Sequence, residues 1–274
     1  MTKVKKSSIL LTCLLLALLC GLLFYIDGNA SKYIIRITRL CAINIVLALS
    51  MNLVNGFTGI FSLGHAGFMA IGAYTVALLT IPVAKKETIF MLEPLIAPLN
   101  TLTLPFGAAL IIGGLLAAAL AFLIGLPCLR LRGDYLAIAT LGFSEIIRIV
   151  ITNAQSLTNG AQGLKSIPAT ANIWWCYGVA LATIVFIALL ISSSYGRAFK
   201  AIREDEIAAE SMGVSLLRHK MLSFMLSAFL AAVGGGLFAS YIGSYYYFCA
   251  VSSSGSLDCY GAIYAYGVVP GFVV

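Results

Sequence analysis

The sequence predicts an all-α, polytopic membrane protein, and three observations lead to that prediction. Of its 274 residues, 61% are hydrophobic and only 10% are charged, whereas about a quarter of an ordinary soluble domain is charged. Several apolar stretches have close to the roughly 20 residues that an α-helix needs to cross a bilayer. These stretches are continuous rather than alternating in polarity, which favours helices over a membrane β-barrel.

The N-terminal third of the sequence predicts three spans. Three lysines in MTKVKK precede an apolar run at 9–26, which we interpret as an uncleaved first span. A cleaved signal peptide is the alternative, because small residues follow the run. The second span covers about 36–55 and the third about 60–82, with a very short connection at 55–59.

Four further spans complete a predicted bundle of about seven helices, and polar segments separate them. The spans are 104–126, 135–153, 174–191 and 221–242. With the N-terminal lysines in the cytoplasm, six crossings return the chain to the cytoplasm near residue 192. Ten Lys and Arg residues then lie inside and six outside, the bias expected for cytoplasmic loops.

Other functional classes lack the required motifs. The seven cysteines lie mostly in apolar runs without CxxC or metal-ligand spacing, so they are interpreted as small hydrophobic residues. The net charge of +7 comes without a basic run interleaved with aromatic residues, which argues against nucleic acid. HExxH, GxSxG and paired aspartates within the spans are missing, so the sequence predicts neither an enzyme nor a metal site.

Nine of the 27 charged residues lie in one stretch, GRAFKAIREDEIAAESMGVSLLRHK, at 196–220. We predict a short cytoplasmic helix from about 198 to 212, supported by the pairs Lys200/Glu204 and Arg203/Glu206 and terminated by Gly213. A small patch of Ala208, Ala209 and Met212 would permit close approach of another molecule. A solvated connector is the alternative, although a connector between two spans needs few residues.

The run Glu206-Ile207-Ala208-Ala209, followed by Gly213, resembles the EAA loop of ABC-transporter permeases. In that family the loop is a cytoplasmic coupling helix that docks on an ATP-hydrolysing subunit. The resemblance implies an ATPase-coupling role within the loop 194–220. The residues that it assigns to this role are Arg203, Glu204, Asp205, Glu206, Ala208, Ala209, Glu210 and Gly213.

Two other stretches, NLVNGFTGIFSLGHAGFMAIGAYTVALL at 52–79 and LRLRGDYLAIATLGFSEIIRI at 129–149, resemble M-type permeases of the branched-chain amino acid uptake family. The resemblance implies a non-enzymatic permease subunit in the bacterial cytoplasmic membrane. Its expected partners are a homologous second permease, two ATP-binding subunits and an extracytoplasmic solute-binding protein that docks on loops including 154–172. ATP and magnesium would belong to the ATP-binding subunits, and no cofactor to this chain.

The substrate and the mode of transport stay open at this point. Related permeases of the family carry urea or short amides. A secondary transporter or channel is the alternative of another class, in which Glu145 could serve as an ion-coupling carboxylate, but it would leave the charged cytoplasmic helix unexplained.

Glycine and polar residues concentrate where the second and third predicted spans meet. Tight helix packing through small residues explains the five glycines within 52–72. A broken backbone that lines a water-filled cavity is the alternative, since irregular backbone at membrane depth needs such surroundings. The candidate pathway residues are Asn52, Asn55, Gly59, Ser62, Gly64 and His65.

Glu145 and Arg148 are charged residues within a predicted span, and their spacing of three places them on one helical face. Each isolated charge would cost roughly 2.5–3.5 kcal/mol at the centre of a bilayer, so the two should pair and face the bundle interior. A structural ion pair is one interpretation. In the other, the pair lines the transport pathway together with Asp134 and changes partners as the gate moves.

The tail at 244–274 departs from the pattern of the family. Family members continue with further transmembrane helices, whereas the apolar piece at 259–274 is interrupted by glycines and Pro270 and is too short for a span. We therefore divide the chain into a permease domain at 1–243 and an atypical tail. The expectation is that the C-terminal helices of the family are missing through truncation or a shifted reading frame.

Overall fold

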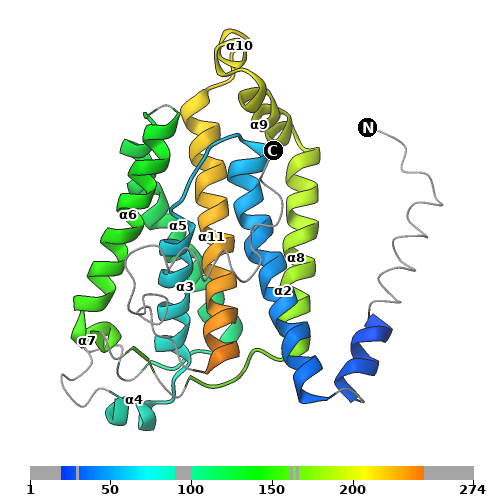
Figure 1. Cartoon of the computed structure of the whole chain (residues 1–274), viewed down its shortest axis with the longest axis vertical. Helices are drawn as coiled ribbons and strands as arrows, with labels where there is room; N and C mark the ends of the chain where they lie inside the picture. The colour runs from blue at the N-terminus through cyan, green and yellow to red at the C-terminus, as the bar shows by residue number, and fades with distance from the viewer. Residues whose placement is uncertain are drawn as a thin grey trace.

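The computed structural model describes residues 20–28, 31–89, 100, 102–131, 133–160, 163–164 and 167–243. In this part of the chain the regular structure is helical, and the long helices run side by side along the longest axis of the molecule (Figure 1). The predicted all-α membrane bundle is thus confirmed. Most of the predicted first span and the whole tail at 244–274 lie outside the described residues.

Eleven labelled elements follow residues 20–28, which are themselves helical. They are α2 (Lys32–Asn52), the π-helical turn η1 (Leu53–Phe57), α3 (His65–Thr80), α4 (Val83–Ile89), α5 (Phe106–Cys128), α6 (Asp134–Asn153), α7 (Gln155–Thr158), α8 (Ile173–Ser192), α9 (Ser194–Glu204), α10 (Glu206–Ser211) and α11 (Leu216–Ile242). Among the described residues, five helices are long and apolar enough to cross a membrane: α2 with η1, α5, α6, α8 and α11.

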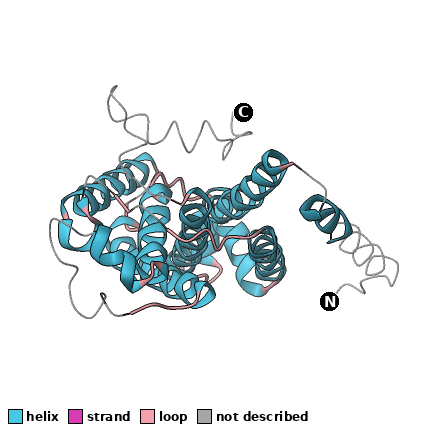
Figure 2. Cartoon of the chain, turned by 90° about the horizontal axis from the view of Figure 1, so that it is seen from below, coloured by secondary structure: helices cyan, strands magenta, loops and turns pink. Residues whose placement is uncertain are grey.

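The long helices alternate in direction, and the short ones lie at the two ends of the bundle. Helices α9 and α10 occupy one end, and α4 and α7 occupy the other (Figure 1). We call these the α10 end and the α4 end. Seen along the bundle, the helices form one elongated cluster, and residues 20–28 stand beside it (Figure 2).

The third crossing differs from its prediction, because helix α3 begins at His65 rather than near residue 60. Its 16 residues rise about 24 Å, which is less than the roughly 30 Å of a hydrocarbon layer. The non-helical segment 58–64, with Gly59 at φ +73°, leads from η1 to α3. The left-handed conformation at Gly59 ends the preceding helix. The residues after Gly59 stay non-helical, so α3 is shorter than predicted.

Helix α11 forms the centre of the bundle and packs against α2, α3 and α5. Its contact with α3 is so close that two glycines are required. A Cβ atom on Gly72 would lie 2.1 Å from the Ala232 carbonyl oxygen, and one on Gly235 would lie 2.1 Å from the Met69 carbonyl oxygen. Small residues at helix crossings are the usual means of close packing in lipid, so the packing interpretation holds for Gly72, and Gly235 on α11 extends it.

Helices α5, α6 and α8 present large apolar side chains outward. Leu123, Ile138 and Leu189 are each about two-thirds exposed, at 68%, 68% and 66%. Outward surfaces of this apolar kind are suited to contact with the hydrocarbon of a lipid bilayer.

At the α4 end, Leu164 and Ile167 fold back onto the bundle and are buried, and the Ile167 amide donates a hydrogen bond to the Gly243 carbonyl at 2.9 Å. Part of the predicted external loop is therefore packed against α11.

We predict that Gly72→Ala destabilises the protein, because the added methyl group would meet the backbone of Ala232 on α11 and force the two helices apart. Overpacking of this kind costs about 1–3 kcal/mol. The measurement is the thermal unfolding midpoint of the purified protein in detergent. The matched control is Gly178→Ala on α8, where a Cβ atom meets nothing within 4 Å. Equal midpoints for the two variants would contradict the close packing.

Candidate functional site

Helix α9 lies across the α10 end and is held by its apolar face. Phe199 and Ile202 are completely or almost completely buried, at 0% and 2% exposure, whereas Arg197 and Lys200 are exposed. The ring of Phe199 meets His219 of α11 edge-on, at 6.4 Å between centroids. Burial of one face fixes α9 against α8 and α11 and leaves its charged face outward.

The predicted single helix at 198–212 is wrong in one respect, because Asp205 divides it into α9 and α10. The backbone of Asp205 is extended, and its Oδ1 accepts hydrogen bonds from the amides of Ile207 at 2.8 Å and Ala208 at 3.1 Å. An aspartate that caps a new helix competes with continuation of the old one. The chain therefore turns at Asp205.

Helix α10 ends in the manner expected from its glycine. Gly213 has φ +84°, its amide donates to the Glu210 carbonyl at 2.9 Å, and the Val214 amide donates to the Ala209 carbonyl at 3.1 Å. These bonds satisfy carbonyls at the end of the helix, and a left-handed residue there favours glycine. Asp205 and Gly213 thus bound a six-residue helix.

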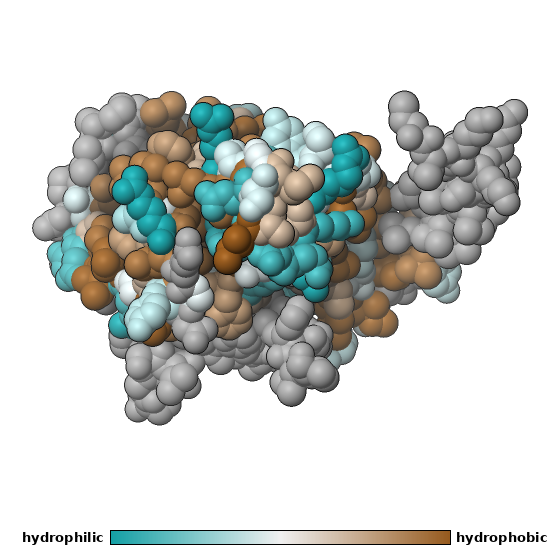
Figure 3. Space-filling model, turned by 90° about the horizontal axis from the view of Figure 1, so that it is seen from above, coloured by the Kyte–Doolittle hydropathy of each residue, from teal (hydrophilic) through white to brown (hydrophobic). Residues whose placement is uncertain are grey.

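The small apolar patch predicted on this helix is divided between two faces. Ala209 is buried against the bundle at 4% exposure, whereas Ile207 and Met212 are 73% and 85% exposed. Ala208 and Glu210 also face outward. Viewed from the α10 end, apolar groups stand among hydrophilic ones over this part of the surface (Figure 3). The exposed apolar groups are therefore Ile207, Met212 and Ala208, and Ala209 is the member of the predicted patch that is buried.

Ionic contacts fix this segment to the bundle, but they are not the predicted ones. Glu206 Oε1 accepts a hydrogen bond from Lys220 Nζ on α11 at 2.5 Å, and Lys220 is only 7% exposed. Arg203 Nη1 donates to the Gly56 carbonyl of η1 at 2.8 Å. The expected Arg203/Glu206 pair is replaced because the turn at Asp205 separates the two side chains.

The turn η1 leaves backbone groups that side chains satisfy. The Leu53 carbonyl accepts from Thr58 Oγ1 at 3.0 Å and from Ser223 Oγ of α11 at 3.3 Å, and the two hydroxyl oxygens lie 2.6 Å apart. All three residues are buried. A departure from the α-helix in lipid is tolerated where neighbouring helices supply such partners.

The candidate pathway residues mostly hold the segment 58–64 in place. Asn55 Oδ1 accepts from the Ser62 amide at 3.2 Å, and Ser62 Oγ accepts from the Gly64 amide at 3.4 Å. His65 Nε2 lies 3.0 Å from Ser227 Oγ on α11. Asn52 is exposed, with its side chain against Gly56. The structure thus places all six candidates, Gly59 included, in the connection between α2 and α3.

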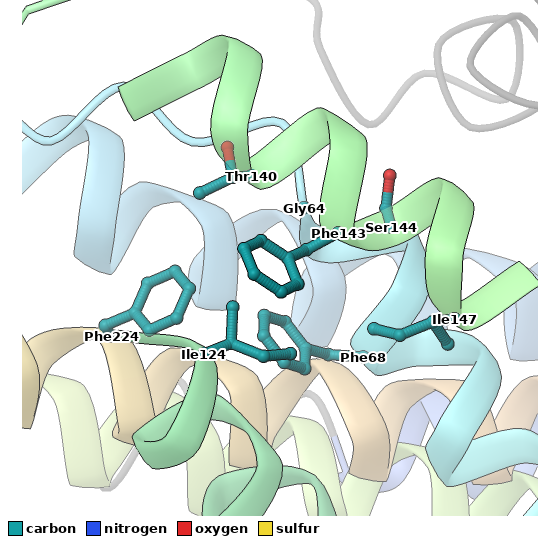
Figure 4. Close-up of a pocket in the computed structure, with 8 residues that line it drawn as sticks. All are labelled: Gly64, Phe68, Ile124, Thr140, Phe143, Ser144, Ile147 and Phe224. Carbon is teal, nitrogen blue, oxygen red and sulfur yellow. The ribbon is translucent and has the colours of Figure 1, made fainter. Parts of the chain in front are cut away.

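Helix α6 joins this connection through Thr140, whose Oγ1 accepts from the Leu63 amide at 3.1 Å. Beside it lies a cavity of about 10 Å³ between α3, α5, α6 and α11. The side chains of Phe68, Ile124 and Phe143 converge there (Figure 4). A cavity of this size holds about one water molecule. It is too small for an amino acid.

Glu145 and Arg148 form the expected pair further along α6, with Arg148 Nε 2.7 Å from Glu145 Oε2. Glu145 lies about 17 Å from the start of α6, near the middle of the helix. Their side chains are 28% and 25% exposed, and α6 lies at the rim of the bundle (Figure 1). The prediction of an ion pair is correct, but the pair is not enclosed by the described part of this chain.

Several polar residues of the site were missed from the sequence. Thr58, Thr140, Ser223, Ser227 and Lys220 make the contacts described above. Ser223 and Ser227 carried a usable signal, because a spacing of four places two hydroxyls on one face of an otherwise apolar span. The role of Lys220 depends on the turn at Asp205 and had no signal of its own.

The fold and the site together define an integral membrane protein in which apolar helices surround an interrupted backbone and an exposed charged segment covers one end. Comparison with known families gives the particular assignment. The family described as branched-chain amino acid transport system / permease component matches residues 33–254. The chain belongs to this family, as its resemblance in sequence predicted.

The individual proteins to which the chain is similar are also named as permeases. The chain is 38% identical to the high-affinity branched-chain amino acid transport system permease protein LivM of Escherichia coli over 77% of its own length and 53% of that protein. It is 23% identical to a probable LivM of Methanocaldococcus jannaschii over 72% and 64% of the two chains. Guanosine ABC transporter permease protein NupQ of Bacillus subtilis is 26% identical over 68% and 60%.

The chain spans about half the length of the first two curated relatives that it matches. No solved structure matches it.

We predict that Glu206→Gln destabilises the α10 end, because it leaves the mostly buried Lys220 ammonium without its carboxylate. Since Glu206 itself is 44% exposed, the expected loss is only about 1 kcal/mol. The double variant Glu206→Gln/Lys220→Met should recover most of it. Thermal unfolding of the four members of this cycle measures the coupling, and additive losses would show that the pair does not stabilise the fold.

Proposed function

We propose that this chain is a permease subunit of an ATP-driven importer for branched-chain or other hydrophobic amino acids. The family match over residues 33–254 carries this proposal. The exposed, charged α9–α10 segment supports it, because a permease that performs no chemistry needs a surface on which an ATP-hydrolysing partner can act. ATP and magnesium belong to that partner.

Helix α10 is the surface proposed for the two ATP-binding subunits. Ile207 and Met212 project from it as large apolar side chains, with Ala208 and Glu210 beside them. Apolar anchors surrounded by polar residues are typical of the residues that dominate a protein interface. Arg203, Asp205, Glu206, Ala209 and Gly213, by contrast, act by shaping and fixing the segment.

A homologous second permease is the partner proposed for α6. Glu145 and Arg148 lie near the middle of a helix at the rim and are about a quarter exposed. Contact with hydrocarbon at that depth is unfavourable even for a paired charge. A second permease that covers this face would enclose the pair at a pathway between the two subunits. Sharing the pathway also fits the small size of the cavity beside Thr140.

The orientation follows from charge. Arg197, Lys200, Arg203, Arg218 and Lys220 all lie near the α10 end, so this end faces the cytoplasm by the positive-inside rule. The α4 end then faces outward, where an extracytoplasmic solute-binding protein would deliver substrate. We assign the chain to the bacterial cytoplasmic membrane with a cytoplasmic N-terminus.

Uptake into proteoliposomes tests the proposal. The chain is reconstituted with a homologous permease, two ATP-binding subunits and a solute-binding protein, with ATP inside the vesicles and radiolabelled leucine outside. We expect uptake that needs both ATP and the binding protein. Uptake of urea instead of leucine would favour the short-amide alternative. Uptake driven by an ion gradient without ATP would indicate a secondary transporter and overturn the proposal.

The same complex tests the docking surface. Ile207→Asp and Met212→Asp should each lower the amount of ATP-binding subunit that co-purifies by about tenfold, since each places a charge on an apolar anchor. Ser211→Asp adds the same charge to the same helix without removing an anchor and should retain the partner. Equal retention by all three variants would contradict docking through these two side chains.

Variants of the α6 pair decide between its two proposed roles. Glu145→Gln should lower both the unfolding midpoint and leucine uptake, because Arg148 loses its partner near mid-membrane. The double variant Glu145→Gln/Arg148→Gln should recover the midpoint but leave uptake at least about tenfold reduced if the pair lines the pathway. Recovery of uptake together with the midpoint would reduce the pair to a structural role.

A further inference from the structure

Arg203 makes a long-range connection at the end of α9, because its guanidinium bonds to the bundle although the residue as a whole is exposed. Its Nη1 donates a hydrogen bond to the Gly56 carbonyl at 2.8 Å, across 147 positions of sequence. Gly56 belongs to η1, where the backbone departs from the α-helix. The charge of Arg203 is therefore directed at a backbone carbonyl at the end of the crossing formed by α2 and η1.

A second contact lies on the same side chain. A Cβ atom on Gly59 would stand 3.1 Å from Cγ, 3.2 Å from Cα and 3.3 Å from Cβ of Arg203. Gly59 has φ +73° and opens the non-helical segment 58–64. Because Gly59 carries no side chain, the stem of Arg203 can lie directly against its backbone. One residue thus contacts both the last part of η1 and the start of the segment that follows.

Arg203 is also close to α10 along the chain. Only Glu204 separates it from Asp205, whose side chain caps α10 and whose amide donates to the Ala201 carbonyl at 3.1 Å. Helix α10 is also held to α11 by the Glu206–Lys220 pair. A displacement of α10 therefore reaches the Arg203 backbone through one intervening residue.

Beyond Gly59, the segment leads to two of the long helices. The Leu63 amide donates to Thr140 of α6, and His65, which begins α3, lies at hydrogen-bond distance from Ser227 of α11. A shift of the backbone at 56–59 would strain or release both contacts. The same α6 carries Glu145 and Arg148. The contacts therefore run without a gap from α10 to the helix proposed to line the pathway.

We propose that Arg203 transmits the movement of α10 to the interrupted backbone at 53–64, and so couples ATP hydrolysis to the transport pathway. This inference rests on the proposed function and deepens it. Arg203 is a positioning residue here, acting through the backbone of Gly56 and Gly59, and not a docking residue for the ATP-binding subunit.

The test uses the reconstituted complex with Arg203→Gln, Arg203→Lys and the matched control Lys200→Gln. Lys200 lies one turn earlier on α9 and is exposed. In a background with the other cysteines replaced by serine, a nitroxide spin label is attached at Phe61→Cys. Phe61 lies in the segment 58–64 and is 56% exposed. The readouts are co-purified ATP-binding subunit, ATP hydrolysis, leucine uptake per ATP hydrolysed, and the change in label mobility when ATP and vanadate are added.

We expect Arg203→Gln to retain its ATP-binding subunits and its hydrolysis, to lower uptake per ATP by about tenfold, and to abolish the nucleotide-dependent change at Phe61→Cys. Arg203→Lys keeps a donor for the Gly56 carbonyl and should recover part of both losses. Lys200→Gln should behave as the parent chain does.

Three outcomes would overturn the inference. Loss of the ATP-binding subunits from Arg203→Gln would make Arg203 a docking residue. A label spectrum already altered before ATP is added would make it a static support of the segment. Unchanged leucine uptake per ATP hydrolysed in Arg203→Gln would show that Arg203 has no part in coupling. Absence of ATP-driven uptake by the parent chain would instead refute the proposed function, and this inference with it.

Discussion

Backbone amides and carbonyls inside a hydrocarbon layer must find partners within the protein, and this constraint determines how the bundle is built around its third crossing. The turn η1 and the segment 58–64 abandon the regular helix, so their polar groups need other partners. Thr58 and Ser223 satisfy the Leu53 carbonyl, and Asn55 and Thr140 accept from amides of the segment. The contacts of Ser223 and Thr140 require α11 and α6 to lie in one place.

The same constraint explains why glycine and small polar residues occur together here. Close approach of α3 and α11 at Gly72 and Gly235 brings the hydroxyls of α11 within reach of the break. Helices held apart by large side chains would leave those hydroxyls too distant, and an unsatisfied backbone group in lipid costs several kcal/mol. Packing and an irregular backbone, which the sequence offered as alternatives, are therefore two parts of one arrangement.

Most of the fold could be predicted from the sequence because span length and apolar composition dominate in membrane helices. The five apolar spans that the structure describes begin and end close to their predicted limits. The start of α3 was misplaced because the apolar residues Ile60, Phe61 and Leu63 look like helix in composition, whereas Gly59 decides the conformation. In the site, the ion pair between Glu145 and Arg148 could be predicted, because the two residues are three positions apart on one helix. The contacts of Arg203 and Lys220 could not, because both partners lie far away in the sequence.

The division of the charged segment at Asp205 has a mechanical consequence. A single helix from 198 to 212 would have rotated as one body and carried its outer face past the bundle. Two short helices joined at a capped turn place the anchors Ile207 and Met212 on α10 while α9 stays fixed by Phe199 and Ile202. A force applied to α10 then acts on the turn, where Arg203 and the Glu206–Lys220 pair meet the bundle. The segment is therefore suited to pass a displacement inward, because α10, on which we propose that the partner docks, and the buried α9 are joined but separate.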